Sequence, residues 1–369
     1  MSARGGSVIV SRIVASRQGR VTLDLRLVRA AGRRERERFG GEAMTQDDAT
    51  ITTEYSLAKI REMCTKYRNW GRWGADDEVG TFNLVTPDKV AAAAQLVRRG
   101  KVFSLSLPFD ADGPMTGALG RTNPAHIMLQ DGGDIASGAQ SGMAPLGYTD
   151  DAVYMILQCA TQWDALSHVF MDEKMYNGYG TDSVNSGGAQ KNSITAMKDK
   201  IVTRGVLLDI ARYKGKQWLD ISESITHEDL AGCAQSQGVD IGAGDVVLVR
   251  SGLLAFVRER GSWGQEYAGG NAPGLGVTAA DYFCPLDVAA VATDTSWFEV
   301  QPNETLPDMW QPLHAIMTAN AGITIGEMFD LESLAKDCAD DGVYEFMFVA
   351  PPLNISKAVG SPINPQAIK

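Results

Sequence analysis

The sequence contains no CxxC pair, and its five cysteines are scattered at Cys64, Cys159, Cys233, Cys284 and Cys338. This arrangement argues against a structural zinc knuckle and fits free thiols in a reducing compartment. No apolar run approaches the roughly 18 residues that a membrane-spanning helix needs. The first residues also lack the continuous apolar block of a secretory signal. We therefore expect a cytoplasmic protein with no membrane partner.

Several common functional motifs are also missing. There is no GxSxG elbow of a serine hydrolase, no phosphate-binding P-loop and no GxGxxG dinucleotide fingerprint. Basic residues are not in excess, since 34 Lys and Arg stand against 45 Asp and Glu, for a net charge of -11. Binding to nucleic acid needs a basic surface. We therefore expect a small-molecule substrate and no nucleic-acid partner.

Residues 1–43 differ in composition from the rest of the chain. They contain ten arginines, no lysine and four acidic residues, and Met44 after them reads like a natural start. We interpret the segment as an extension that is disordered or not native. An alternative is a targeting or partner-binding arm, because Arg-rich, acid-poor segments can act as organelle addresses. We expect residues 44–369 to form the functional domain.

Helix and strand patterns alternate along that domain. Residues 86–100 predict a helix with Thr86 as its N-cap, Pro87 in its first turn and Gly100 at its end. A capping box of Thr226 and Asp229 opens another helix. Apolar runs such as "GVLLDI" and "DVVLV" are typical of buried strands, and "VYEFMFV" is expected to be the last strand. The pattern predicts one α/β domain with a mixed sheet.

The segment "QCATQWDALSHVF", residues 158–170, carries the strongest indication of a site. In an extended strand, Gln158, Gln162 and Asp164 would point to the same face. A carboxylate and two amide oxygens suit Mn²⁺ or Mg²⁺ better than zinc, and His168 could reach the same pocket. The alternative is an ordinary polar strand face. Under both interpretations, Trp163 would point to the opposite, buried face of the strand.

This segment resembles the signature His-x-Gly-Thr-His-x-Asp-x-Pro-x-His of the cyclase family, which includes bacterial kynurenine formamidase and isatin hydrolase. The matching positions hold Gln158, Ala160, Thr161, Gln162, Asp164, Leu166 and His168. Threonine, aspartate and the last histidine therefore agree, while glutamine replaces both of the other histidines. Later segments, "RGVLLDIAR", "GDVVLVRSG" and "VATDTSW", resemble the family's strands in the same order.

The resemblance implies a fold and a set of roles. The fold would be a swivelling β/β/α domain with a mixed, barrel-like sheet flanked by helices. Asp164 and Glu327 would be bridging carboxylates, His314 a metal ligand, and His168 the proton donor and acceptor. Gln158 and Gln162 stand where the first ion's histidines would be. We expect either a single ion held mainly by the other ligands, or glutamines that ligate through oxygen, with Mn²⁺ favoured over Zn²⁺.

The resemblance also implies an activity and further residues. We expect hydrolysis of an amide, lactam or N-formyl C–N bond in a small cyclic or aromatic substrate. Alternatives are a metal-assisted cyclase, lyase or isomerase acting through an enolate, and a non-catalytic binding relative. Trp70 and Trp73 could contact the substrate or pack in the core, and His126 could join the site or be a hydrogen-bonded loop residue. The family also implies a homodimer or homotetramer.

Overall fold

The computed structural model describes residues 55–267 and 269–369. The Arg-rich extension expected over residues 1–43 and the expected start at Met44 lie outside these residues. Among the described residues, no helix is long and apolar enough to cross a membrane.

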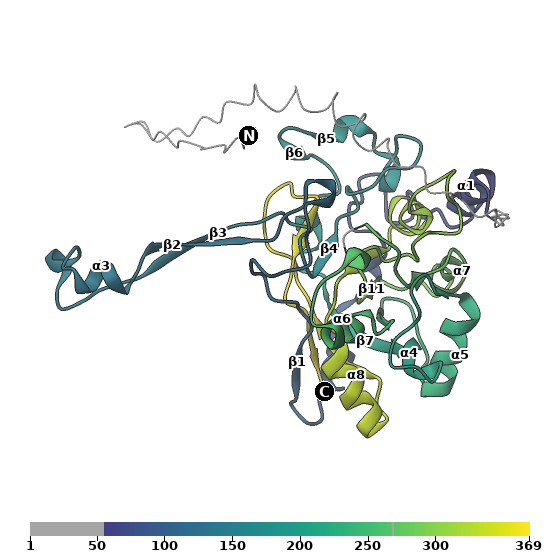
Figure 1. Ribbon diagram of the computed structural model, residues 1–369. Helices are drawn as coiled ribbons and strands as arrows, with labels where there is room; N and C mark the ends of the chain where they lie inside the picture. The colour runs from purple at the N-terminus through teal and green to yellow at the C-terminus, as the bar shows by residue number, and fades with distance from the viewer. Residues whose placement is uncertain (1–54, 268) are drawn as a thin grey trace, which may run out of the picture. The chain divides into compact units, whose positions relative to one another are not determined.

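A nine-stranded mixed sheet forms the centre of the fold and curls into a half-barrel (Figure 1). Its four middle strands are parallel, and the flanking strands pair with them and with each other in antiparallel fashion. In spatial order the strands are β1 (Val102–Ser104), β15 (Gln366–Ile368), β13 (Glu345–Val349), β7 (Val202–Asp209), β9 (Val246–Arg250), β11 (Ala290–Thr293), β12 (Thr324–Glu327), β4 (Gln162–Asp164) and β14 (Gly360–Pro362). The predicted α/β fold with a mixed sheet is confirmed.

Helices and short ribbons surround the sheet. The α-helices are α1 (Leu57–Lys66), α2 (Pro87–Ala94), α3 (Gly132–Ala136), α4 (Ile210–Tyr213), α5 (His227–Gln237), α6 (Leu253–Arg260), α7 (Ala279–Phe283) and α8 (Glu332–Asp341). Short 3-10 helices are η2 (Gly80–Leu84), η3 (Ala118–Gly120), η4 (Ser141–Met143), η5 (Tyr176–Gly178), η6 (Thr181–Ser183), η7 (Ile194–Met197) and η8 (Gln265–Tyr267), and η9 (His314–Ala321) is a π-helix. Two-stranded pairs are β8 (Ser224–Ile225) with β10 (Gly274–Leu275), β2 (Ala125–Gln130) with β3 (Asp150–Tyr154), and β5 (Val184–Asn185) with β6 (Gly188–Ala189).

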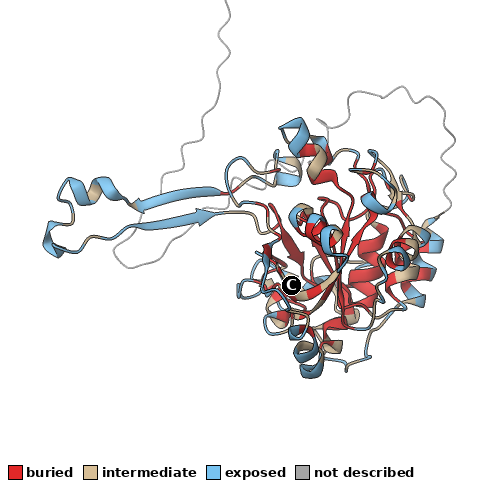
Figure 2. Cartoon of the chain, turned by 90° about the horizontal axis from the view of Figure 1, so that it is seen from below, coloured by how far each residue is buried: buried red, intermediate tan, exposed pale blue. Residues whose placement is uncertain are grey.

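The middle strands are apolar throughout because both of their faces are covered. Along β7, Val206 and Leu208 belong to one hydrophobic cluster, whereas Leu207 belongs to the cluster on the other side of the sheet. Along β9, Val247 and Leu248 divide between the two clusters in the same way. Figure 2 shows this buried centre in red. The apolar runs of the sequence therefore mark the strands that lie deepest in the domain.

Local signals predicted where some elements begin better than where they end. The capping box of Thr226 and Asp229 is present at the start of α5. Thr86 caps α2 as expected, but α2 ends at Ala94, after which the backbone N–H groups of Gln95 and Leu96 donate to the carbonyls of Ala92 and Ala93, three residues back. The prediction that β13 would be the last strand is wrong, since β14 and β15 follow it and join different parts of the sheet.

The ribbon of β2 and β3 extends away from the nine-stranded sheet, and almost all of it is exposed (Figure 2). On one face, Ala125 pairs with Tyr154 and Ile127 pairs with Ala152, so that face is apolar. Ile127 is 51% exposed and Tyr154 is 66% exposed. A two-stranded ribbon alone is marginally stable in water. We therefore expect the apolar face of this ribbon to pack against another protein surface.

Candidate metal centre

Strand β4 carries the first two residues of the site. Gln162 and Asp164 alternate onto one face of this three-residue strand, and both are buried. Trp163 points the other way, as expected, and its indole Nε1 donates to the carbonyl of Ala350 at 2.9 Å. In β12, Gly326 lies directly opposite Trp163, where a side chain would collide with the indole ring. Glycine at this position therefore lets β12 approach β4 closely.

The extended run expected from Gln158 to Asp164 is wrong, because residues 157–161 form turns and bends. Thr161, the last residue of these bends, is held by two hydrogen bonds: its hydroxyl donates to the carbonyl of Met328 at 2.5 Å and accepts from the backbone N–H of Leu107 at 2.8 Å. Gln158 lies against Gly360 of β14, which pairs directly with Asp164, and its buried Nε2 has no hydrogen-bond partner among the described residues. A ligand role for Gln158 stays a prediction.

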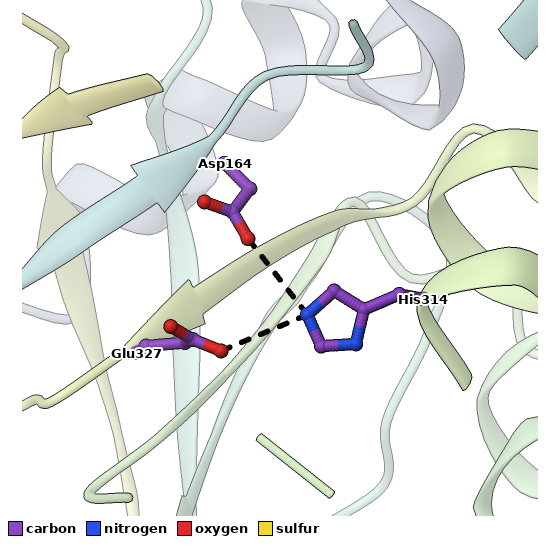
Figure 3. Close-up of side chains that lie close together, drawn as sticks. All are labelled: Asp164, His314 and Glu327. Atoms are coloured by element: carbon purple, nitrogen blue, oxygen red, sulfur yellow. Dashed lines mark ion pairs between the residues drawn. The ribbon is translucent and has the colours of Figure 1, made fainter. Parts of the chain in front are cut away.

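Three buried residues from three elements meet at one point (Figure 3): Asp164 of β4, His314 of η9 and Glu327 of β12. The imidazole Nε2 of His314 lies 3.8 Å from Oδ2 of Asp164 and 3.6 Å from Oε1 of Glu327. Metal ions bind nitrogen and oxygen at about 2.0–2.2 Å. Two ligand atoms bound to one ion at these bond lengths therefore lie roughly 3–4 Å apart. Both distances from Nε2 of His314 fall in this range. The arrangement fits one divalent cation.

A third buried carboxylate orients the histidine. Oε1 of Glu299 accepts from the backbone N–H of His314 at 2.9 Å and lies 2.6 Å from the ring Nδ1. With Nδ1 held by Glu299, Nε2 is the ring atom that faces Asp164 and Glu327, which is the orientation of metal-binding histidines. The sequence reasoning missed Glu299, although a single carboxylate within the otherwise apolar run "WFEV" was an available signal.

The role of Glu299 can be measured directly. Glu299→Gln keeps the shape but removes the charge that orients His314, so metal affinity should fall about 10–100-fold. Calorimetric titration of the metal-stripped protein with Mn²⁺ gives this affinity. Glu345→Gln, in β13, makes the same chemical change away from the site and should leave the affinity unchanged. Equal affinities for both variants would contradict the orienting role.

The charges of the site favour a cation. Burial, together with the nearby Asp164 carboxylate, raises the pKa of Glu327 to about 7, against the opposing effect of His314. Burial alone would lower the pKa of His314, but the hydrogen bonds to Glu299 and Glu327 outweigh it and raise this pKa to about 10. Buried carboxylates are stable only when paired with positive charge or a metal. A divalent ion would meet this need.

His168 follows β4 in the next turn and faces the same cavity. Its Nε2 lies 3.8 Å from Oδ1 of Asp164, and its side chain is 22% exposed. Burial lowers the pKa of His168, although Asp164 opposes this effect. The imidazole is therefore neutral at neutral pH, which is the form that can accept a proton.

The cavity above the site has a volume of about 190 Å³. Besides the four residues expected from the sequence, it is lined by residues that the sequence reasoning did not single out: Leu119, Arg121, Val169, Ser296, Trp297, Trp310 and Gln311. The rings of Trp297 and Trp310 lie 5.4 Å apart at an angle of 58°. The guanidinium of Arg121, which lines the cavity, forms no ion pair or hydrogen bond within the described residues. The cavity thus offers aromatic surface and one free guanidinium near the carboxylates.

The expected substrate-binding residues Trp70, Trp73 and His126 do not line this cavity. Trp70 donates from Nε1 to the carbonyl of Ala319 at 2.9 Å, and so supports the helix that carries His314. Trp73 stacks with Arg72. His126 lies on the exposed ribbon of β2 and β3, where its Nε2 is 2.7 Å from Asp151. Both tryptophans are half-buried and outside the buried core, and His126 matches the alternative of a hydrogen-bonded histidine.

The chain is similar to known proteins in both sequence and fold. The cyclase family model, described as "Putative cyclase", matches residues 103–300. A crystal structure titled a novel cyclase is 37% identical, with a TM-score of 0.75, over 83% of this chain and 99% of that one. No curated protein matches the chain.

Two isatin hydrolase A structures share the fold at lower identity. The enzyme from Ralstonia solanacearum is 19% identical with a TM-score of 0.56, and that from Labrenzia aggregata is 18% identical with a TM-score of 0.54. Each alignment covers 76% of this chain and 97% of the other.

Proposed function

Because this chain belongs to the cyclase family, we propose that it is a metal-dependent hydrolase that cleaves a C–N bond in a small cyclic or aromatic substrate. The observation that carries the proposal is the convergence of Asp164, His314, Glu327 and His168 on one cavity. The isatin hydrolases among the structural neighbours support hydrolysis as the class of reaction.

The residues of the cavity divide the chemistry between them. Asp164, His314 and Glu327 would hold a divalent ion, which would supply a Lewis acid for polarising a carbonyl and acidifying water. His168, neutral and within the cavity, accepts a proton from the attacking water and returns it to the leaving nitrogen. Arg121 can stabilise the negative charge that develops on the carbonyl oxygen.

The cavity also supports the choice of substrate and metal. Trp297 and Trp310 offer ring faces to an aromatic or cyclic group, and a cavity of about 190 Å³ admits only a small molecule. Two carboxylates and one imidazole form an oxygen-rich ligand set, which favours Mn²⁺ over Zn²⁺.

The reaction can be tested with a panel of aromatic N-formyl compounds, lactams and simple amides, analysed by mass spectrometry in the presence of Mn²⁺. Gain of one water by a panel member supports hydrolysis. A product of unchanged mass would instead indicate isomerisation or cyclisation through an enolate, and loss of a fragment without water would indicate a lyase. Binding of a panel member without turnover in metal-replete protein would identify a non-catalytic relative.

We also propose a cytoplasmic location. All five cysteines are free and buried, and burial raises the pKa of their thiols, for example to about 12 at Cys64. Such thiols are unreactive and need no oxidising compartment.

For assembly we propose a homodimer or homotetramer in which a second copy covers the apolar face of the β2–β3 ribbon. Ile127→Asp places a charge on this face and should shift the protein to a monomer in size-exclusion chromatography with light scattering. Leu353→Asp is a matched control, since Leu353 is 47% exposed but lies outside the ribbon. A wild-type monomer, or an unchanged oligomer in the Ile127 variant, would contradict this role of the ribbon.

A further inference from the structure

The two carboxylates of the site present two separate sides. Oδ2 of Asp164 and Oε1 of Glu327 lie nearest to Nε2 of His314, at 3.8 and 3.6 Å. Their other oxygens, Oδ1 and Oε2, lie nearest to the side-chain amide nitrogen of Gln162, at 3.4 and 3.0 Å. The carboxylate pair is therefore approached by the imidazole from one side and by an amide from the other.

The fold holds the amide of Gln162 in this position. Gln162 lies directly opposite Glu327 in the antiparallel pairing of β4 with β12 and two residues before Asp164, so all three side chains share a face. Its side chain is completely buried, and its Oε1 has no hydrogen-bond partner within the described residues. Turning the amide over would put this oxygen against two carboxylates, which is repulsive. The orientation with nitrogen toward the carboxylates is therefore required by their charge.

We propose that the amide of Gln162 occupies the position that a second cation would take between the two carboxylates, and so limits the centre to one divalent ion on the His314 side. This inference rests on the proposed function, since it assumes that the His314 side binds metal. The two amide hydrogens satisfy Oδ1 and Oε2 without adding a net charge to the buried site. A second cation would have to displace both contacts, because it could be bound by Gln162 only through Oε1.

The amide of Gln162 also keeps a second cation from binding to His168. Nε2 of His168 lies 3.8 Å from Oδ1 of Asp164, the same oxygen that Gln162 contacts. A cation on this side would have His168 as its nearest nitrogen ligand, and a ligated imidazole cannot accept a proton at the same atom. By filling the space with an uncharged donor, Gln162 leaves His168 free to transfer protons.

Metal stoichiometry tests the inference without relying on activity. Metal-stripped protein is titrated with excess Mn²⁺ by calorimetry, and bound metal per chain is measured by atomic emission after removal of free ion. We expect one ion in the wild type and two in Gln162→Glu, because the variant replaces the amide donor with a third carboxylate. Gln190→Glu makes the same change at an exposed residue outside the cavity lining, where Gln190 contacts Lys357, and should retain one ion.

Thermal unfolding provides the second measurement. The third carboxylate should lower the melting temperature of metal-free Gln162→Glu, and Mn²⁺ should raise it by more than it raises that of the wild type, because two ions bind only the folded state. If this variant does not fold, Gln162→His offers a neutral second-site ligand and the same expected count of two. Two ions in the wild type, or one in the folded variants, would overturn the inference. No ion in the wild type would overturn the proposed function, and the inference with it.

Discussion

Asp164→Asn should nearly abolish both metal binding and turnover. The substitution keeps the volume of the side chain but removes one of the two negative charges that face His314. Changes to residues that only orient a ligand typically cost about 10–100-fold in metal affinity, so the loss of a ligand itself should cost more than about 100-fold. Turnover should fall at least as far, because the Lewis acid is lost with the ion.

Calorimetric titration with Mn²⁺ and turnover on the best substrate of the panel measure these two losses. Asp330→Asn, which removes a carboxylate paired with Arg258 on the surface, is the matched control and should change neither quantity. Stripping wild-type protein with a chelator should reproduce the loss, and Mn²⁺ should restore more activity than Zn²⁺. Full activity of the metal-free protein would contradict a metal-dependent mechanism.

His168→Ala should lower turnover about 100-fold or more, because general acid–base catalysis typically contributes roughly 10²–10⁴-fold. The variant should still bind one Mn²⁺ per chain, since His168 is not among the three residues that converge on the cation position. Measuring both turnover and bound metal therefore separates loss of a proton-transfer group from loss of the ion.

His227→Ala is the matched control for this variant. His227 begins α5, far in the fold from the cavity lining, and its ring packs on Tyr282. Its replacement should leave turnover unchanged. If His168→Ala retains wild-type turnover, His168 is not the acid–base group, and if it loses metal as well as turnover, it is a ligand.

Much of the fold could be predicted because its signals are local. The buried strands β7 and β9 are visible as apolar runs, since strands covered on both faces need no polar alternation. The cap of α5 is visible as Thr226 and Asp229, since both partners lie within one turn. The placement of β14 and β15 was not visible, because it depends on pairing with segments far away in the sequence.

The residues of the candidate site also fall into two groups: those that the sequence indicated and those that only the structure revealed. Asp164, His168, His314 and Glu327 were identified through the resemblance to the family, and the structure brings all four to one cavity. Gln158 was expected to share their face through a continuous strand, but residues 157–161 form turns and bends, so its path could not be predicted from strand alternation. Trp297, Trp310 and Arg121 were not anticipated, since nothing in the order of residues indicates which aromatic and basic side chains will line a cavity.

The sequence by itself determined the chemical types available to this protein: four histidines, five scattered cysteines and an excess of carboxylates that gives a net charge of -11. It also determined the strands and capped helices, because these depend on neighbouring residues. Only the tertiary structure decided which oxygens of Asp164 and Glu327 face His314 and which face Gln162. The physical reason is that this choice is set by the register between β4 and β12, whose partners are separated by more than 160 residues of chain.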